Sequence, residues 1–85
     1  MIITFTDKAL KGYRKLPLPI KKKADKQFKF VVNNMYYPSL NTKKMEGADL
    51  WEARIDRSYR FTFEKHKDEM ILRTVGPHDE GLGKR

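Results

Sequence analysis

The residues best suited to chemistry lie between positions 50 and 79, where arginines alternate with apolar side chains and a histidine follows. Arg54, Arg60 and Arg73 each fall in a separate strand-like run, and His78 and Asp79 come just after the last of these runs. Arginine presents a planar fork of donors that suits a phosphate group, and histidine exchanges a proton near neutral pH. The spacing predicts a sheet face that holds a phosphate, with a group for proton transfer at its rim.

Three predicted strands position these side chains. The runs 51–56 and 59–64 alternate apolar with polar residues, as expected for strands whose side chains point to opposite faces. A third run, 70–75, is mostly apolar. Short polar breaks separate the three runs, so we expect an antiparallel meander with the first two arginines on the face opposite to Ala53 and Phe61.

The first half of the chain predicts one further strand and two helices. Residues 2–5 are β-branched and aromatic, Thr6 or Asp7 can cap a helix that follows, and the prolines of 16–19 end it. A second helix is expected from about 19 to 33, and 34–49 reads as a loop. The chain therefore predicts a single α+β domain, 1–85, of order β-α-α-β-β-β. Two N-terminal helices pack on one face of an antiparallel sheet and leave the other face open.

Composition narrows the classes of partner. The net charge is +8, and residues 1–49 carry 11 Lys and Arg against 4 Asp and Glu. This balance favours a polyanion, either nucleic acid or a strongly acidic protein, although lysines on a solvated helix give the same count. There is no cysteine, and two histidines make a metal site unfavourable. No apolar run suits a membrane span and no signal-peptide pattern is present, so we expect a cytoplasmic protein without metal or cofactor.

Element order and motifs together resemble the RelE/ParE superfamily of toxin–antitoxin toxins. The resemblance rests on LWEARIDRSYRFTF and VGPHDE, and it extends to LPLPIKKKADKQF and PSLNTKKMEG, covering almost the whole chain. The GPHD ending is similar to one RelE-like branch. The resemblance implies the RelE-like fold and a type II toxin that cleaves mRNA, usually on the ribosome, without a metal. It also implies an acidic antitoxin that holds the toxin inactive. Operator DNA would be bound only through the complex with that antitoxin.

The resemblance also assigns residues. Arg60 matches the most recurrent active-site arginine of the family, His78 matches a position of catalytic Arg or His, and Arg54 matches a lysine of RelE. Glu52 stands where RelE has a second lysine and the tail lacks a tyrosine, so acid–base work would pass to His78 with a carboxylate, Glu52 or Asp79. Either carboxylate is equally suited to be a structural partner of an arginine.

Remaining cationic and aromatic residues are predicted to position substrate: Lys43, Lys44, Arg57, Arg73 and Trp51. For several candidates a structural role stays open. The structural alternatives are an ion pair of Arg60 with Glu52 or Glu64, a rim salt bridge for Arg73, and a core position for Trp51 in place of stacking on a base. At the level of function, the alternatives are a ParE-like DNA gyrase poison and an inactive antitoxin-binding module.

Overall fold

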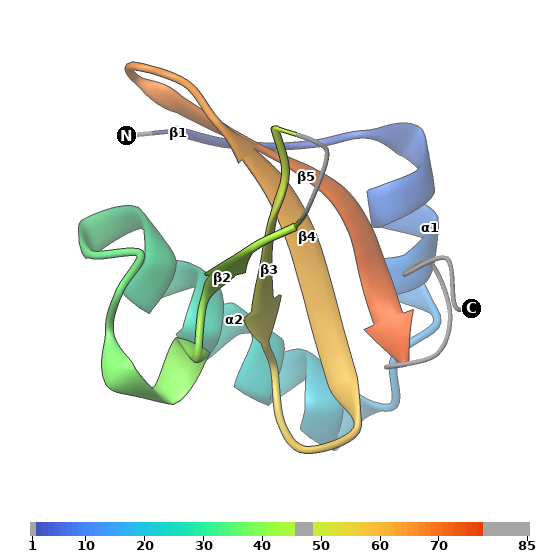
Figure 1. Cartoon of the computed structure of the whole chain (residues 1–85). Coiled ribbons are helices and arrows are strands. Elements are labelled where there is room, and N and C mark those ends of the chain that lie inside the picture. The colour runs from blue at the N-terminus through green and yellow to red at the C-terminus, as the bar shows by residue number, and fades with distance from the viewer. Residues whose placement is uncertain (1, 46–48, 78–85) are drawn as a thin grey trace.

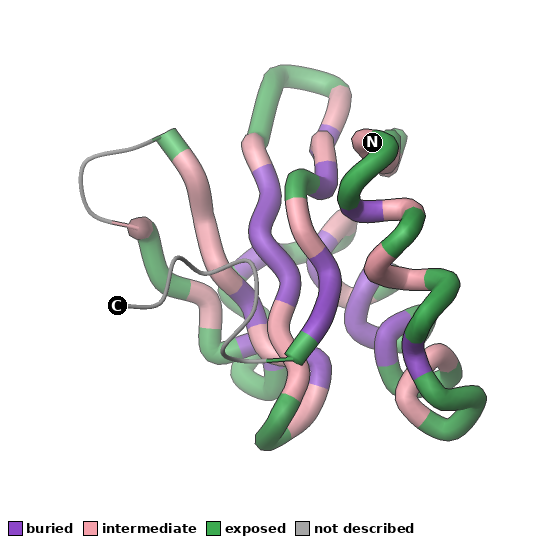
Figure 2. Tube along the Cα trace, turned by 90° about the vertical axis from the view of Figure 1, so that its right-hand side faces the viewer, coloured by how far each residue is buried: buried purple, intermediate pink, exposed green. Residues whose placement is uncertain are grey.

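Five strands form one sheet, in the order β1-β5-β4-β3-β2. A computed structural model describes residues 2–45 and 49–77 of the chain. Its elements are β1 (Ile2–Phe5), α1 (Asp7–Arg14), α2 (Leu18–Asn33), the 3-10 helix η1 (Pro38–Leu40), β2 (Lys43–Lys44), β3 (Trp51–Arg54), β4 (Tyr59–Lys65) and β5 (Glu69–Pro77). Both helices lie on the same side of the sheet (Figures 1 and 2). The predicted α+β class, the order of the predicted elements and the meander of β3, β4 and β5 are confirmed.

Two features of the sheet differ from the prediction. The sheet is mixed rather than antiparallel, because β1 pairs in parallel with β5 at its outer edge. The segment 34–49 is not simply a loop, since it contains η1 and the short strand β2, which pairs with β3. Alternation of apolar residues tells which face a side chain occupies but carries no information about the neighbouring strand, and a two-residue strand has no pattern at all.

Local signals set the helix boundaries as predicted. The Thr6 hydroxyl accepts a hydrogen bond from the Ala9 backbone N–H at 3.1 Å and caps α1. The helix packs tightly on β5 at Gly12, where an added Cβ would lie 2.0 Å from the carbonyl oxygen of Val75. Pro17 and Pro19 stand at the start of α2, where a missing N–H costs no helical hydrogen bond. Neither described helix is long and apolar enough to cross a bilayer.

The core lies between the helices and the sheet. Ala24, Phe28 and Val31 of α2 are buried, and the Phe28 ring meets Phe61 of β4 edge to face at 5.0 Å between centroids. Strand register places Ala53, Phe61 and Val75 side by side on the helix side. The opposite side is called here the outer sheet face, and it carries Glu52, Arg54, Arg60, Thr62 and Thr74.

Candidate functional site

Strand register brings two of the predicted arginines together. Arg54, the last residue of β3, is paired directly with Arg60 of β4, and Arg60 is paired with Gly76 of β5. Their neighbours Ala53 and Phe61 point to the core, so both arginines project from the outer sheet face. Like charges directly opposite each other destabilise a sheet. An anion bound between the two guanidinium groups would remove that repulsion.

The turn between β3 and β4 holds the Arg60 side chain. Its Nη1 donates to the carbonyl oxygens of Asp56 at 3.0 Å and Arg57 at 3.3 Å. The Asp56 carboxylate in turn accepts from the backbone N–H groups of Ser58 at 2.8 Å and Tyr59 at 3.0 Å, which shapes the turn. All the hydrogen bonds of this guanidinium to described residues use Nη1. The donors on Nε and Nη2 are therefore available to a ligand.

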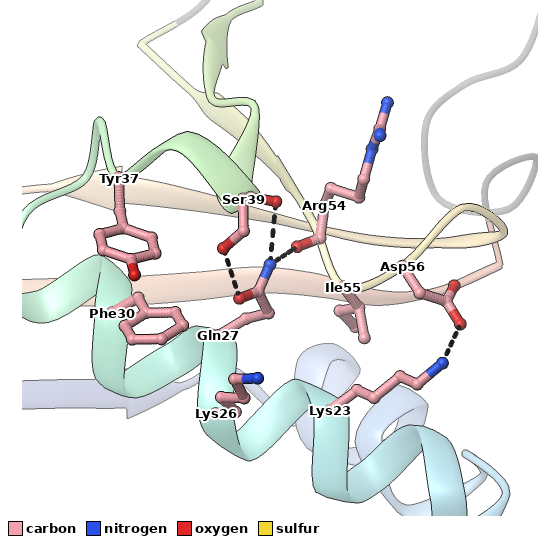
Figure 3. Close-up of a pocket in the computed structure, with 9 residues that line it drawn as sticks. All are labelled: Lys23, Lys26, Gln27, Phe30, Tyr37, Ser39, Arg54, Ile55 and Asp56. Atoms are coloured by element: carbon pink, nitrogen blue, oxygen red, sulfur yellow. Dashed lines mark hydrogen bonds and ion pairs between the residues drawn. The ribbon is translucent and has the colours of Figure 1, made fainter.

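Arg54 is anchored through its backbone rather than its side chain. Its carbonyl oxygen accepts a hydrogen bond from Nε2 of Gln27 at 2.8 Å, while the guanidinium extends away from Gln27 (Figure 3). The Nε of Arg54 is buried and has no hydrogen-bond partner within the described ranges. A buried charged donor without an acceptor is costly, and a phosphate oxygen is a strong acceptor for it.

Glu52 lies in the next row of the outer sheet face. It is paired with Thr62 of β4 and with Lys43 of β2. The Thr62 hydroxyl shares a hydrogen bond of 2.7 Å with that of Thr74 on β5. Within the part of the chain that the structure describes, no ion pair joins Arg60 to Glu52 or to Glu64, so the ion pair weighed for that arginine is not the arrangement present.

Arg73 does not join the other two arginines. The register of β4 and β5 shifts between Thr62 and Phe63, and Arg73 falls at this irregularity. Its Nη1 forms an ion pair with Glu64, whose other oxygen shares a hydrogen bond of 2.9 Å with Nε2 of His66. The hydrogen bond from His66, followed by that from Arg73, lowers the pKa of Glu64 below its ordinary value. The rim salt bridge considered for Arg73 is therefore the arrangement present.

Other predicted residues take different places. Arg57 is exposed in the turn between β3 and β4, and its carbonyl oxygen supports Arg60. Lys44 is paired with Trp51 at the free edge of the sheet, and Trp51 is half-buried against the core. His78 and Asp79 lie outside the described residues. The last described residue, Pro77, is paired with Tyr59 and so lies at the same end of the sheet as Arg60.

Two polar residues with specific contacts, Gln27 and His66, were not among the predicted site residues. Gln27 is buried at a core position of α2, where its amide bonds to Ser39 as well as to Arg54. His66 follows Glu64 by two residues and shares its side of the strand. A polar residue within the apolar stripe of α2 was the available signal for Gln27, and the two-residue spacing was the signal for His66.

A cavity of about 420 Å³ lies between α2 and the end of β3 (Figure 3). Lys23, Lys26, Phe30, Tyr37 and Asp56 contribute to its lining, and Lys23 forms an ion pair of 3.6 Å with Asp56. Arg54 also contributes to the lining, while its guanidinium extends away from α2 in Figure 3. The described residues include no group of three His, Asp or Glu side chains able to hold a metal ion.

Comparison with solved structures shows which fold this is. The chain superposes on the YoeB/ParE toxin from Agrobacterium tumefaciens with a TM-score of 0.79 and 14% identity, covering 92% of this chain and 99% of the toxin. It superposes on YafQ from E. coli strain BL21(DE3) with a TM-score of 0.78 and 10% identity, over 95% and 97% of the two chains. A chain of the intact E. coli RelBE toxin–antitoxin complex gives a TM-score of 0.73 and 23% identity, over 88% and 93%.

These likenesses establish the α+β fold seen in RelE and YoeB toxin structures. No family model and no curated protein sequence matches the chain. At 10–23% identity the structural likeness speaks for the fold and not for the activity.

Proposed function

We propose that the chain is a RelE/ParE-superfamily toxin of a type II toxin–antitoxin system, acting as a metal-independent endoribonuclease on mRNA, on the ribosome. The observation that carries the proposal is the registered pair of Arg54 and Arg60 on the outer sheet face, neither of them in an ion pair with a described carboxylate. The shared fold and the net charge of +8 support it.

The reaction breaks one phosphodiester bond by transfer within the RNA itself. The ribose 2′-oxygen attacks the adjacent phosphorus and loses its proton to a base, while the 5′-oxygen leaves and gains a proton from an acid, so that a 2′,3′-cyclic phosphate and a 5′-hydroxyl result. Arg54 and Arg60 stabilise the charge that develops on the phosphate oxygens. Proton transfer is assigned to His78 with a carboxylate, Glu52 or Asp79, which remains a prediction from the sequence.

An antitoxin partner follows from the same proposal. Structures with this fold include the YoeB-YefM complex from Staphylococcus aureus and the DinJ-YafQ toxin–antitoxin complex from E. coli. An acidic antitoxin would complement the charge of +8, and operator DNA would be reached only through such a complex. Lys43, Lys44 and Arg57 are assigned to the RNA backbone, because lysines and arginines on phosphates position a nucleic acid without reading its bases.

The test is induced expression in a bacterium, followed by mapping of the 5′ ends of cellular mRNA. We expect new ends within translated codons for the parent chain, and their loss in Arg60→Gln and His78→Ala. Arg14→Gln on α1 is the matched control, because it removes the same charge from an exposed position on the helix side of the sheet, and it should cleave as the parent does. Each variant is checked for folding by its thermal unfolding.

Intact mRNA with growth arrest and DNA breaks would replace the proposal with that of a gyrase poison. Cleavage that persists unchanged in Arg60→Gln would show that the arginine pair is not the site of phosphate binding.

A further inference from the structure

The segment that follows α2 exposes an aromatic side chain beside the free edge of the sheet. Tyr36 is 64% exposed, and its ring meets the ring of Trp51 edge to face, with centroids 6.2 Å apart. Its backbone N–H bonds to Oδ1 of Asn34 at 2.9 Å, which fixes the residue relative to the end of the helix. Tyr36, Trp51, Lys43 and Lys44 are called here the aromatic corner.

The ring of Tyr36 is not stacked on another described ring, in contrast to that of its neighbour Tyr37. The Tyr37 ring is stacked on Phe30 at 4.1 Å with an interplanar angle of 18° (Figure 3). Among the described residues, Trp51 is the one aromatic ring that meets Tyr36, and Tyr36 is 64% exposed. At least one face of the Tyr36 ring is therefore free for a planar ligand.

Two lysines of β2, next to Trp51 at the sheet edge, point to opposite sides of the sheet. Lys44 is paired with Trp51, and its Nζ lies 5.8 Å from the centroid of the indole ring. Lys43 is paired with Glu52 and so belongs to the outer sheet face, since adjacent strand residues point to opposite sides. Lys44 forms a 3.8 Å pair with Asp49 that is exposed and therefore weak. A flexible anion can pass over β2 and meet one lysine on each side.

We propose that the aromatic corner is a subsite for single-stranded RNA, in which a nucleobase stacks on Tyr36 and Lys43 and Lys44 hold the flanking phosphates. The inference rests on the proposed function in taking RNA as the ligand. Stacking on an aromatic ring beside cationic side chains is the general means of holding single strands, and it tolerates any base because each has a π-face. Trp51 and Arg54 are three strand residues apart, about 10 Å along β3, and their side chains point to opposite sides of the sheet. An RNA strand that passes over the edge strand β2, from Lys44 to Lys43, would reach both the corner and the arginine pair.

Trp51 gives a direct reading of occupancy, because it is the one tryptophan in the chain. The experiment titrates the purified chain with a 2′-O-methyl oligonucleotide, which cannot undergo transfer from the 2′-oxygen, and follows indole fluorescence. We expect a saturable change for the parent chain. Tyr36→Ala should weaken binding about tenfold, within the range found for loss of one stacked base. Tyr36→Phe keeps the ring and should bind as the parent does, whereas Tyr36→Leu should behave as the alanine variant does.

Charge is tested separately by the dependence of affinity on salt. Lys44→Gln should reduce the slope of log affinity against log salt by about 0.7, the value for one phosphate contact with a single strand. Lys22→Gln on the exposed side of α2 removes the same charge at a distance and should leave the slope unchanged. An equal change in both variants would show that net charge, and not the corner, attracts the RNA.

The outcomes separate this inference from the proposed function. Tyr36→Ala binding the oligonucleotide as tightly as the parent overturns the subsite, even if the chain cleaves mRNA. Loss of binding in Tyr36→Ala supports the subsite, even if no mRNA cleavage is found in cells. An equal response to a poly-glutamate peptide, retained in Tyr36→Ala, would assign the surface to an acidic protein instead and overturn the inference.

Discussion

Gln27 tests how the packing of α2 positions Arg54. Its side chain is 6% exposed, its Nε2 donates to the carbonyl oxygens of Arg54 at 2.8 Å and Ser39 at 3.1 Å, and its Oε1 accepts from the Ser39 hydroxyl at 3.0 Å. Gln27→Met keeps the length of the side chain and removes all three hydrogen bonds. Leaving a buried polar group without its partner costs about 1–3 kcal/mol. Since two carbonyl groups lose their donor, we expect the free energy of unfolding to fall by about 2–4 kcal/mol.

Urea unfolding of the parent and of Gln27→Met measures this difference, provided that the free energy of unfolding falls with urea concentration at the same slope in both. Ser39→Ala is the graded control, because it removes the hydroxyl bond to Gln27 and leaves both carbonyl bonds in place, so we expect a loss of about 1 kcal/mol or less. Gln27→Met should also lower mRNA cleavage more than Ser39→Ala does, because it frees the backbone of Arg54. A Gln27→Met chain within about 0.5 kcal/mol of the parent, the range of an ordinary surface substitution, would refute a structural role for these bonds.

Three further changes have defined outcomes. Gly12→Ala places a Cβ 2.0 Å from the Val75 carbonyl oxygen, where ordinary contact begins at 3.4 Å. Thermal unfolding should therefore show that the free energy of unfolding falls by about 2 kcal/mol or more, against about 0.5 kcal/mol or less for Lys11→Ala at an exposed position of the same helix. The pKa of the Glu64 carboxyl, measured by NMR, should lie below its ordinary value of 4.5 and should rise in His66→Ala and in Arg73→Ala. Because the folded pKa is the lower one, the contribution of Glu64 to stability is present above the unfolded pKa, is lost as pH falls through the folded pKa, and weakens with salt. A pKa that is the same in both variants as in the parent would show that these bonds do not form in solution. Sulfate at ten times its Kd should stabilise the parent by about 1.4 kcal/mol relative to chloride of equal ionic strength, and stabilise Arg60→Gln less; equal stabilisation of both would count against anion binding at the arginine pair.

Strand faces and helix ends were predictable because both depend on local geometry. The alternation in 51–56 and 59–64 placed Ala53 and Phe61 toward the core and the arginines outward, as the structure has them. Thr6 caps the first helix through a hydrogen bond to a backbone N–H only three residues further on, that of Ala9. The parallel pairing of β1 with β5 and the existence of β2 depend on residues far away in the chain, so no local pattern encodes them.

The sequence identified individual residues of the candidate site, but it did not show which of them lie next to each other. Arg54 and Arg60 were each identified, whereas their direct pairing depends on the register that the turn between them sets. For Arg73 the mostly apolar run 70–75 left substrate binding and a rim salt bridge both open, and the irregularity opposite Thr62 and Phe63 places it beside Glu64. His78 and Asp79 stay predictions, since they lie beyond the last described residue.

The three arginines differ in the groups that hold them, and this difference leaves Arg54 and Arg60, but not Arg73, suited to bind an anion. Arg73 is bound by the carboxylate of Glu64, so its charge is largely cancelled where it stands. Arg60 is held by carbonyl oxygens, and Arg54 is positioned by a hydrogen bond to its own carbonyl from Gln27. Neither arrangement brings a carboxylate to the guanidinium, so both side chains keep their attraction for a phosphate. The repulsion between them is then greatest when the site is empty, and binding of an anion relieves it, which is why Arg60→Gln should weaken anion binding more than it weakens the fold.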